Sequence, residues 1–197
     1  MVMPIPAATW TREQVLALPD DGNRYELVDG ELLVSPSPRG RHQRGVWKLY
    51  DRVKPFVHAN QLGVTGLAPA DLAIDGGQIL QPDLFVAALI DGREPVDWAD
   101  FGVPRLIAEI LSPSTARYDR IVKRFKFQKV RVAEYWVVDL DARAIERWRP
   151  DDLRPELLDT TMVWEPNPNG PPLVIDLVEY FRDVWAESIR STESGPG

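Results

Sequence analysis

Residues 105–115 read RLIAEILSPST, a short apolar run that ends in a break. A buried run of this kind is typical of a central strand whose two faces are both covered. The segment Ser112-Pro113-Ser114-Thr115 then ends the strand and supplies an N-cap for a helix to about Val130. A central strand followed directly by a helix predicts an α/β fold.

Four helices are expected besides isolated turns. Thr11 and Gln14 have capping-box spacing, which predicts a short helix ahead of Pro19. Apolar residues recur at helical spacing over residues 40–59, and Pro55 is expected to kink or shorten that helix. The third helix runs from residue 115 to about residue 130, and the fourth covers residues 177–189. Residues 191–197 are expected to form a frayed tail.

The remaining regular segments predict a mixed central sheet flanked by these helices. Asp29-Gly30 joins two short apolar stretches and supplies the positive φ of a two-residue hairpin turn. Glu26 is interpreted as lying opposite Glu31 in this hairpin. The expected strands are 25–28, 31–34, 64–67, 71–74 with Ile79, 82–87, 105–111, 134–140, 144–148 and 173–175.

The composition describes one soluble domain over residues 1–197. At 197 residues and 44% hydrophobic content, a single core is expected, and no apolar run approaches the length of a membrane span. The N-terminus lacks the features of a secretory signal, so the cytoplasm is the expected compartment. With no cysteine and two histidines, a metal would need oxygen ligands, which favours magnesium, manganese or calcium.

Two acidic residues stand where such a metal could bind. Asp83 follows Pro82 at the start of a predicted strand, and Glu109 lies inside the apolar central strand, where a buried carboxylate needs a partner or a metal. Magnesium is held by one or two carboxylates with waters and substrate phosphate. The backbone carbonyl of Ile110 could supply a further oxygen. Alternatively, Asp83 caps a turn and Glu109 belongs to a core ion pair.

A lysine at this site would stabilise the charge that develops on a phosphate in the transition state. The PD-(D/E)XK nuclease pattern places it two residues after the glutamate, where this chain has Leu111. Lys123 follows Asp119 by four residues, so the two share a helix face, and Lys123 is the proposed substitute. Lys126 is the alternative, and a simple surface ion pair between Asp119 and Lys123 is the competing reading.

The chain resembles the Uma-two family of restriction-endonuclease-like proteins, within the PD-(D/E)XK nuclease superfamily. The resemblance covers about residues 9–150, and its motifs occur together and in order. They are Tyr25-Glu26-Leu27-Val28-Asp29-Gly30-Glu31, Ser35-Pro36-Ser37-Pro38 leading to His42, Gln81-Pro82-Asp83, Glu109-Ile110-Leu111-Ser112-Pro113-Ser114-Thr115 with Asp119 and Lys123, and Glu134-Tyr135-Trp136-Val137-Val138-Asp139.

The resemblance implies a restriction-endonuclease-like fold with Asp83, Glu109 and Lys123 at the catalytic site and Glu26 as an accessory acid. It also brings one departure into view, because relatives usually carry glycine where this chain has Arg131. Arg131 must adopt a positive φ at the helix end, or the helix must end differently.

The net charge of -7 argues against a protein that coats nucleic acid nonspecifically. Two segments, 38–54 and 115–131, are nevertheless rich in Arg and Lys and suit an anionic substrate that approaches one face. A charge run can also be only a solvated helix face. The candidate nucleic-acid-binding residues are Arg39, Arg41, His42, Arg44, Arg120 and Lys126.

These observations predict a magnesium-dependent or manganese-dependent endonuclease that cleaves DNA, and a homodimer is the expected form for cleavage of both strands. Two other hypotheses remain open. One is a nuclease fold that has lost activity and serves in binding or assembly, which Leu111 and the net negative charge favour. The other is a phosphodiesterase that acts on RNA.

Overall fold

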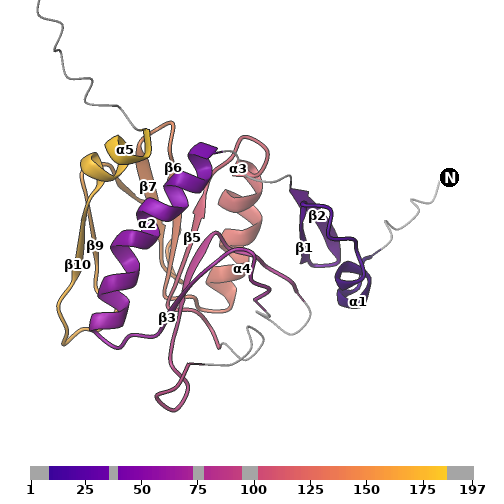
Figure 1. Ribbon diagram of the computed structural model, residues 1–197, viewed down its shortest axis with the longest axis horizontal. Helices are drawn as coiled ribbons and strands as arrows, with labels where there is room; N and C mark the ends of the chain where they lie inside the picture. Colours follow the sequence, from indigo (N-terminus) through magenta and orange to yellow (C-terminus); the bar gives the residue numbers. More distant parts are fainter. Residues whose placement is uncertain (1–8, 36–39, 73–77, 95–101, 186–197) are drawn as a thin grey trace, which may run out of the picture.

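The computed structural model describes residues 9–35, 40–72, 78–94 and 102–185 (Figure 1). Arg39, the last two residues of the expected strand 71–74 and the predicted tail therefore lie outside the described residues. The elements in chain order are α1 (Arg12–Leu16), β1 (Arg24–Val28), β2 (Glu31–Ser35), α2 (Gly40–Ala59), β3 (Val64–Leu67), β4 (Leu84–Ala87), β5 (Leu106–Ile110), α3 (Ala116–Tyr118), the π-helical turn η2 (Asp119–Lys123), α4 (Arg124–Lys129), β6 (Glu134–Asp139), β7 (Ala144–Trp148), β8 (Glu156–Leu158), β9 (Thr161–Trp164), β10 (Leu173–Asp176) and α5 (Leu177–Trp185).

The central sheet has the strand order β3-β4-β5-β6-β7-β8. Strand β5 pairs with β4 in the antiparallel sense and with β6 in the parallel sense, so the sheet is mixed, as predicted. A parallel pair needs a crossover connection, and the helical segment from α3 to α4 provides it. The apolar run around residue 109 is thus an interior strand of the sheet.

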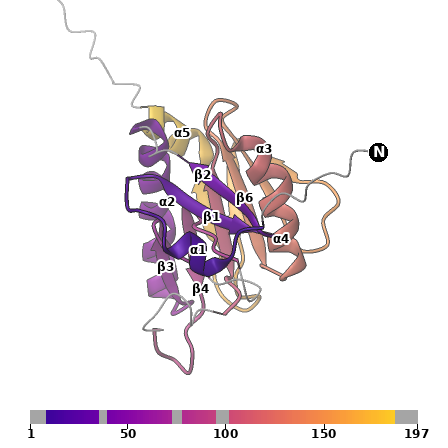
Figure 2. The ribbon, with the colours of Figure 1, turned by 90° about the vertical axis from the view of Figure 1, so that its right-hand side faces the viewer.

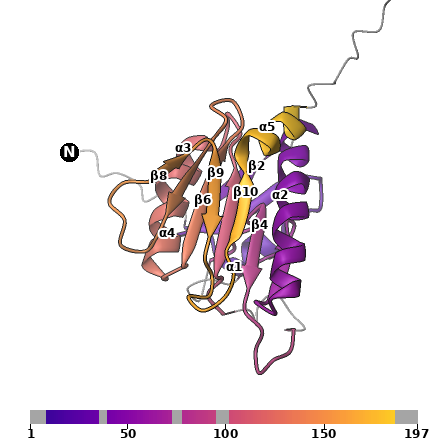
Figure 3. The ribbon, with the colours of Figure 1, turned by 90° about the vertical axis from the view of Figure 1, so that its left-hand side faces the viewer.

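Alternation along the strands sends even-numbered and odd-numbered side chains to opposite faces of the sheet. On β5, Ala108 and Ile110 join an apolar core with α2, α5 and the β9–β10 hairpin. Ile107 joins a second core with residues of α4 and the first hairpin. Figure 3 shows α2 and α5 on one side of the sheet and α3 and α4 on the other. Glu109 has the parity of Ile107 and therefore faces α4.

The first hairpin, β1 with β2, lies on the α4 side of the sheet, between α2 and α4 in Figure 2. Asp29 and Gly30 have φ values of 51° and 82°, which confirms the predicted two-residue turn. A backbone pair between Leu27 and Ile79 joins the hairpin to the chain that leads into β4. The capping box of Thr11 and Gln14 is present at the start of α1.

Helix α2 continues through Pro55 to Ala59, so Pro55 does not shorten it, and the alternative expectation of a kink stays a prediction. Proline leaves the carbonyl four residues earlier without its helical partner. That carbonyl belongs to Asp51, which is exposed, as is Pro55, so water can satisfy it. The buried residues of α2 lie at helical spacing and pack on the even-numbered face of the sheet.

Strands β8 and β9 were not predicted from the sequence. Strand β8 has three residues and forms one edge of the central sheet. Strand β9 pairs with β10 in a separate two-stranded sheet that closes the core over Trp136, and its buried members are Met162 and Trp164. The segments around both strands are interrupted by polar residues and proline, which hides the alternation.

The helical segment after β5 ends near Arg131, which stands where relatives usually carry glycine. Arg131 has a φ of 66°, so a non-glycine residue adopts the left-handed conformation there. Its guanidinium pairs with Asp151 on the surface. None of the helices among the described residues has both the length and the apolar character needed to cross a membrane.

Candidate active site

Asp83 and Glu109 lie side by side at the end of strand β5. The backbone N–H of Asp83 donates to Glu109 Oε2 at 3.3 Å, and the N–H of Ile110 donates to Asp83 Oδ2 at 2.9 Å. Both residues are 2% exposed. The antiparallel pairing of β4 with β5 sets Leu84 opposite Ala108, which brings the residue before Leu84 next to the residue after Ala108. Ile110 contacts Asp83 through its N–H group, and a role for its carbonyl as a metal ligand stays a prediction.

Lys123 is the lysine that reaches this pair. Its Nζ lies 2.8 Å from Glu109 Oε1 and 3.0 Å from Glu26 Oε1, and the side chain is 3% exposed. The alternative, Lys126, forms an ion pair with Asp29 in the hairpin turn instead. The geometry therefore brings Lys123 into the position that Leu111 leaves without a lysine.

The π-helical turn η2 sets the orientation of Lys123. The carbonyl of Asp119 accepts the N–H of Arg124, five residues on, and also the hydroxyl of Tyr135 at 3.0 Å. π-helical turns are rare and occur frequently at functional sites. Asp119 Oδ1 lies 3.5 Å from Lys123 Nζ and has no hydrogen-bond partner among the described residues. Asp119 is 2% exposed, so the pair that could have been a surface ion pair is buried.

Glu26 enters the site from the first hairpin. It is 3% exposed, and its Oε1 accepts the backbone N–H of Gln81 at 2.9 Å in addition to contacting Lys123. The interpretation that Glu26 lies opposite Glu31 is wrong, because the register pairs Glu26 with Leu33. A two-residue turn at Asp29-Gly30 fixes that register, so the sequence contained the information.

Two further residues hold Asp83. Arg24 directs Nη1 and Nη2 to Asp83 Oδ1, each at 2.9 Å, and His42 Nε2 lies 3.0 Å from Asp83 Oδ2. His42, a candidate nucleic-acid-binding residue from the sequence, lies in the site beside Asp83, with a buried Nδ1 that has no partner among the described residues. Arg24 was not singled out from the sequence. The sequence did hold one indication of its place, because Arg24 and Glu26 are two residues apart on β1 and therefore point to the same face of the strand.

The four buried carboxylates of this site are here called the acidic group: Glu26, Asp83, Glu109 and Asp119. Burial raises the pKa of Asp83, but contacts from His42, Arg24 and the Ile110 N–H outweigh burial and lower the pKa to about 2. Burial raises the pKa of Glu109 well above its usual value, and Lys123 opposes that shift.

Lys123 remains an ammonium in this environment. Burial lowers its pKa, but Glu109, Glu26 and Asp119 outweigh burial and raise the pKa well above its usual value. Burial likewise raises the pKa of Asp119, with Lys123 opposing the shift. Two permanent cations, Lys123 and Arg24, thus face four acids in direct contact with them, a surplus of two acids, and the pKa values of Glu109 and Asp119 are raised in this environment.

This surplus fits a divalent cation, and carboxylate oxygens are the donors that Mg²⁺ and Mn²⁺ prefer. No three His, Asp or Glu side chains among the described residues stand in a ready-made metal-binding arrangement. The reason is visible in the contacts, because the oxygens already converge on the Lys123 ammonium and the Arg24 guanidinium. Asp83 and Glu109 are the pair that would hold the cation.

The predicted nucleic-acid-binding arginines that the structure describes all have intramolecular contacts. Arg41 stacks on Trp185, with 3.7 Å from its guanidinium carbon to the ring centroid. Arg44 donates to the carbonyl of Val184 at 3.2 Å. Arg120 forms ion pairs at 2.8 Å with Asp139 and 2.6 Å with Glu146. A role for these side chains in binding nucleic acid stays a prediction.

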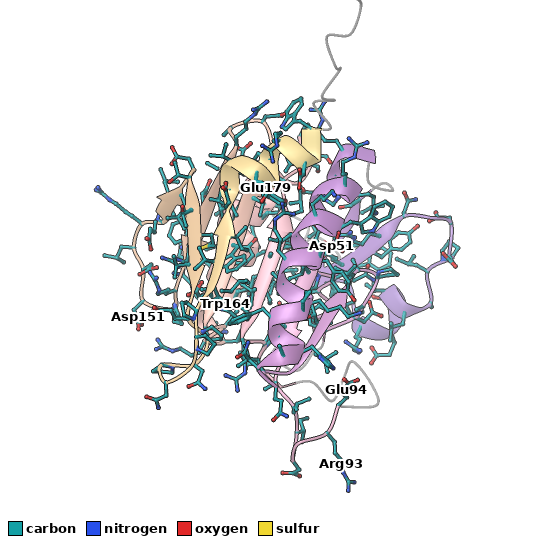
Figure 4. The ribbon with its side chains drawn as sticks, turned by 60° about the vertical axis from the view of Figure 1, so that its left-hand side comes forward. Asp51, Arg93, Glu94, Asp151, Trp164 and Glu179 are labelled. Atoms are coloured by element: carbon teal, nitrogen blue, oxygen red, sulfur yellow. The ribbon has the colours of Figure 1, made fainter. Side chains whose placement is uncertain are left out.

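Charged residues of both signs also lie on the outer surface, away from the acidic group. Figure 4 labels several exposed charged residues on different elements and loops: Asp51, Arg93, Glu94, Asp151 and Glu179. Exposed charges are screened by salt, whereas buried ones are screened much less. The electrostatics of the site are therefore dominated by its own buried groups.

Comparison with known proteins identifies the family and the fold of the chain. The family model Uma2, described as "Putative restriction endonuclease", matches residues 12–178. A crystal structure described as "a putative nuclease belonging to DUF820", from Anabaena variabilis, superposes with a TM-score of 0.70 at 19% sequence identity. The match covers 88% of this chain and 98% of that chain, which confirms the fold. A search among curated proteins found no match.

Proposed function

The chain belongs to the Uma2 family, described as "Putative restriction endonuclease", and from that premise we propose that it is a metal-dependent endonuclease that hydrolyses DNA phosphodiester bonds. The observation that carries the proposal is the charge of the acidic group. Four buried acids contact only two permanent cations at the end of a central strand, and the pKa values of Glu109 and Asp119 are raised there. Stability alone does not account for that arrangement, because burying acids that outnumber their cationic partners costs free energy whether the acids are ionised or protonated.

In the proposed reaction, Asp83 and Glu109 hold a divalent cation, magnesium or manganese. Such an ion, when bound, supplies Lewis-acid charge to the scissile phosphate and lowers the pKa of its water. The two carboxylates suit this role because each is fixed by a backbone contact at the end of β5, so neither needs to be ordered when substrate arrives.

Lys123 acts on the phosphate itself. Its ammonium is buried, permanently charged and aimed at Glu109, so it stabilises negative charge that develops on the phosphoryl oxygens as water attacks in line. Glu26 and Asp119 act through Lys123. They contact the ammonium from the hairpin and from η2, and together they fix where its charge lies.

A plasmid-nicking assay with Mg²⁺ or Mn²⁺ tests this proposal. We expect nicking by the unchanged protein and a loss of roughly a thousandfold in Asp83→Asn and Glu109→Gln. Glu134→Gln is the matched control, because Glu134 lies on the neighbouring strand and bonds Trp136 Nε1, outside the acidic group. Cleavage that survives both site substitutions contradicts the assignment. A panel of single-stranded and double-stranded DNA and RNA separates a DNA enzyme from an RNA-directed one.

The second candidate is an inactive nuclease fold that serves in binding or assembly. The observation in its favour is that Asp83 and Glu109 already have cationic partners from the chain itself. Calorimetric titration with Mn²⁺ separates the two functions. An active site binds the ion in a manner that requires Asp83 and Glu109, whereas a site that serves only as a structural ion-pair network shows no such binding.

We further propose a homodimer as the active form on duplex DNA, since each chain contributes one such site and a double-strand break needs two. Light scattering coupled to size-exclusion chromatography, with and without a DNA duplex, measures this. A mass of one chain under both conditions, together with efficient double-strand cleavage, contradicts the dimer.

A further inference from the structure

Arg24 is the most specific contact of Asp83 that the proposed reaction leaves unused. Both of its terminal nitrogens donate to the same oxygen, Asp83 Oδ1, at 2.9 Å. Nη1 also donates to the carbonyl of Gln81 at 3.1 Å, which helps to hold the guanidinium beside Asp83. The Arg24 side chain is 19% exposed and the Asp83 side chain 3% exposed, so the pair lies where the site meets solvent.

The oxygens of Asp83 are fully engaged by the chain. Oδ2 accepts the Ile110 N–H and lies 3.0 Å from His42 Nε2, while Oδ1 is held by Arg24. The Ile110 N–H belongs to a strand backbone and cannot move away without breaking the sheet. A metal ion that binds Asp83 through Oδ1 must therefore take the place of the Arg24 guanidinium.

The Arg24 guanidinium can move away from Asp83 Oδ1 more easily than the other partners of Asp83. It comes from the first hairpin, which is a separate two-stranded sheet, and its long side chain is partly open to solvent. Figure 2 shows this hairpin lying over the rest of the molecule between α2 and α4. Lys123, by contrast, is 3% exposed and touches three carboxylates, so it has no route to solvent of the same kind.

We propose that Arg24 is the resident cation of Asp83 and that a divalent metal ion displaces its guanidinium from Oδ1. Arg24 is then a positioning residue that keeps Asp83 ionised and oriented before the metal arrives and competes with the metal for the same oxygen. The proposal rests on the proposed function, because it takes Asp83 as a metal ligand. It assigns Arg24 an effect on metal binding that a purely structural ion pair would not have.

The test is calorimetric titration of Mn²⁺ into the full chain and two variants. Arg24→Gln removes the competing guanidinium, and we expect its Mn²⁺ affinity to rise about tenfold or more, because a positive charge in contact with the ligand oxygen is lost. Arg12→Gln is the matched control. Arg12 lies in the same N-terminal segment and donates to the carbonyl of Gln78, not to a carboxylate, so its affinity should change by less than about twofold.

A measurement on the unchanged protein covers the case in which Arg24→Gln folds poorly. Arginine side-chain nitrogens in a buried ion pair give separate, slowly exchanging NMR signals, and the Arg24 signals can be assigned by their loss in Arg24→Lys. We expect these signals to broaden or collapse as Mg²⁺ is added. The midpoint of that change should equal the midpoint of metal binding.

The outcomes separate this inference from the proposed function. If Mn²⁺ binding requires Asp83 but is no tighter in Arg24→Gln than in Arg12→Gln, or if the Arg24 signals persist at saturating Mg²⁺, the competition does not occur and the inference alone fails. If the unchanged protein and Arg24→Gln both bind no Mn²⁺, the metal site itself fails and both proposals are overturned.

Discussion

The two faces of strand β5 differ in polarity, because one is purely apolar and the other carries the buried acid Glu109. Ala108 and Ile110 point into an apolar core, where burial stabilises the fold and no polar group has to be neutralised. Glu109, one residue away, points into a group of four acids whose burial costs several kcal/mol per ion before pairing. An apolar side chain at position 109 would avoid that cost. The face of Ala108 and Ile110 is therefore purely apolar, whereas the other face combines the apolar contacts of Ile107 with the costly buried acids of the candidate site.

The largest effect is expected from breaking the charged face at Lys123. Lys123→Met leaves Glu26, Glu109 and Asp119 without their shared counterion, which should lower the free energy of unfolding by about 3–5 kcal/mol and abolish cleavage. Urea denaturation and the nicking assay measure the two effects. The double variant Glu109→Gln/Lys123→Met should regain part of the stability and none of the activity. A double variant no more stable than Lys123→Met would contradict the coupling.

The apolar face should respond in stability alone. Ile145 is fully buried in the same core as Ala108, on strand β7 and away from the acidic group. Ile145→Ala should lower the free energy of unfolding by about 3 kcal/mol, because it leaves a cavity in a close-packed core. Mn²⁺ affinity measured on the folded variant should stay unchanged. A loss of metal affinity as large as the loss of stability would show that the two faces are not separable.

Glu134 is a partly buried glutamate outside the acidic group, and its titration should contribute to the pH dependence of the free energy of unfolding. Burial raises its pKa, and the bond from Trp136 Nε1 opposes the shift. A raised pKa means that the folded state holds the proton more tightly, so this residue's contribution to stability falls as pH rises from the usual glutamate range. Glu134→Gln should therefore lose less stability than the unchanged protein between about pH 4 and 7, by about 1 kcal/mol or less. Thermal melts across that range check it, and parallel curves would be the contrary result.

The smallest effect is expected at the surface end of the helical segment. Arg131 adopts a φ of 66°, which costs a non-glycine residue free energy, and its ion pair with Asp151 is exposed. Arg131→Gly should raise the free energy of unfolding by about 0.5 kcal/mol, since exposed pairs contribute little. Chemical denaturation with well-determined midpoints resolves this. A clear loss of stability would mean that the Asp151 pair contributes more than its exposure suggests.

Local signals account for what the sequence predicted well. The Asp29-Gly30 turn, the Thr11 capping box and the apolar run around Glu109 each act over a few residues, and the structure contains all three. The expectation of a single domain stays a prediction. Strand β8, with three residues and mostly exposed side chains, lacks a pattern long enough to detect.

Apart from the contacts of Lys123 with Asp119 and Glu109, the partners of charged residues could not be predicted, because they are set by tertiary neighbours far apart in the chain. Arg120 was expected to face a substrate, yet it pairs with Asp139 and Glu146, from β6 and β7. The π-helical turn that buries Asp119 has no sequence signature of its own. Arg24 did have one, in its shared parity with Glu26, but nothing in the sequence indicated that its partner is Asp83.

The most direct test of the metal site is a crystal grown with Mn²⁺ and measured at a wavelength where manganese scatters anomalously. We predict an anomalous peak about 2.0–2.3 Å from oxygens of both Asp83 and Glu109, with Arg24 no longer within hydrogen-bond distance of Asp83 Oδ1. Peaks found only at exposed acids, with Asp83 and Glu109 still bound solely to Arg24, His42 and Lys123, would contradict it.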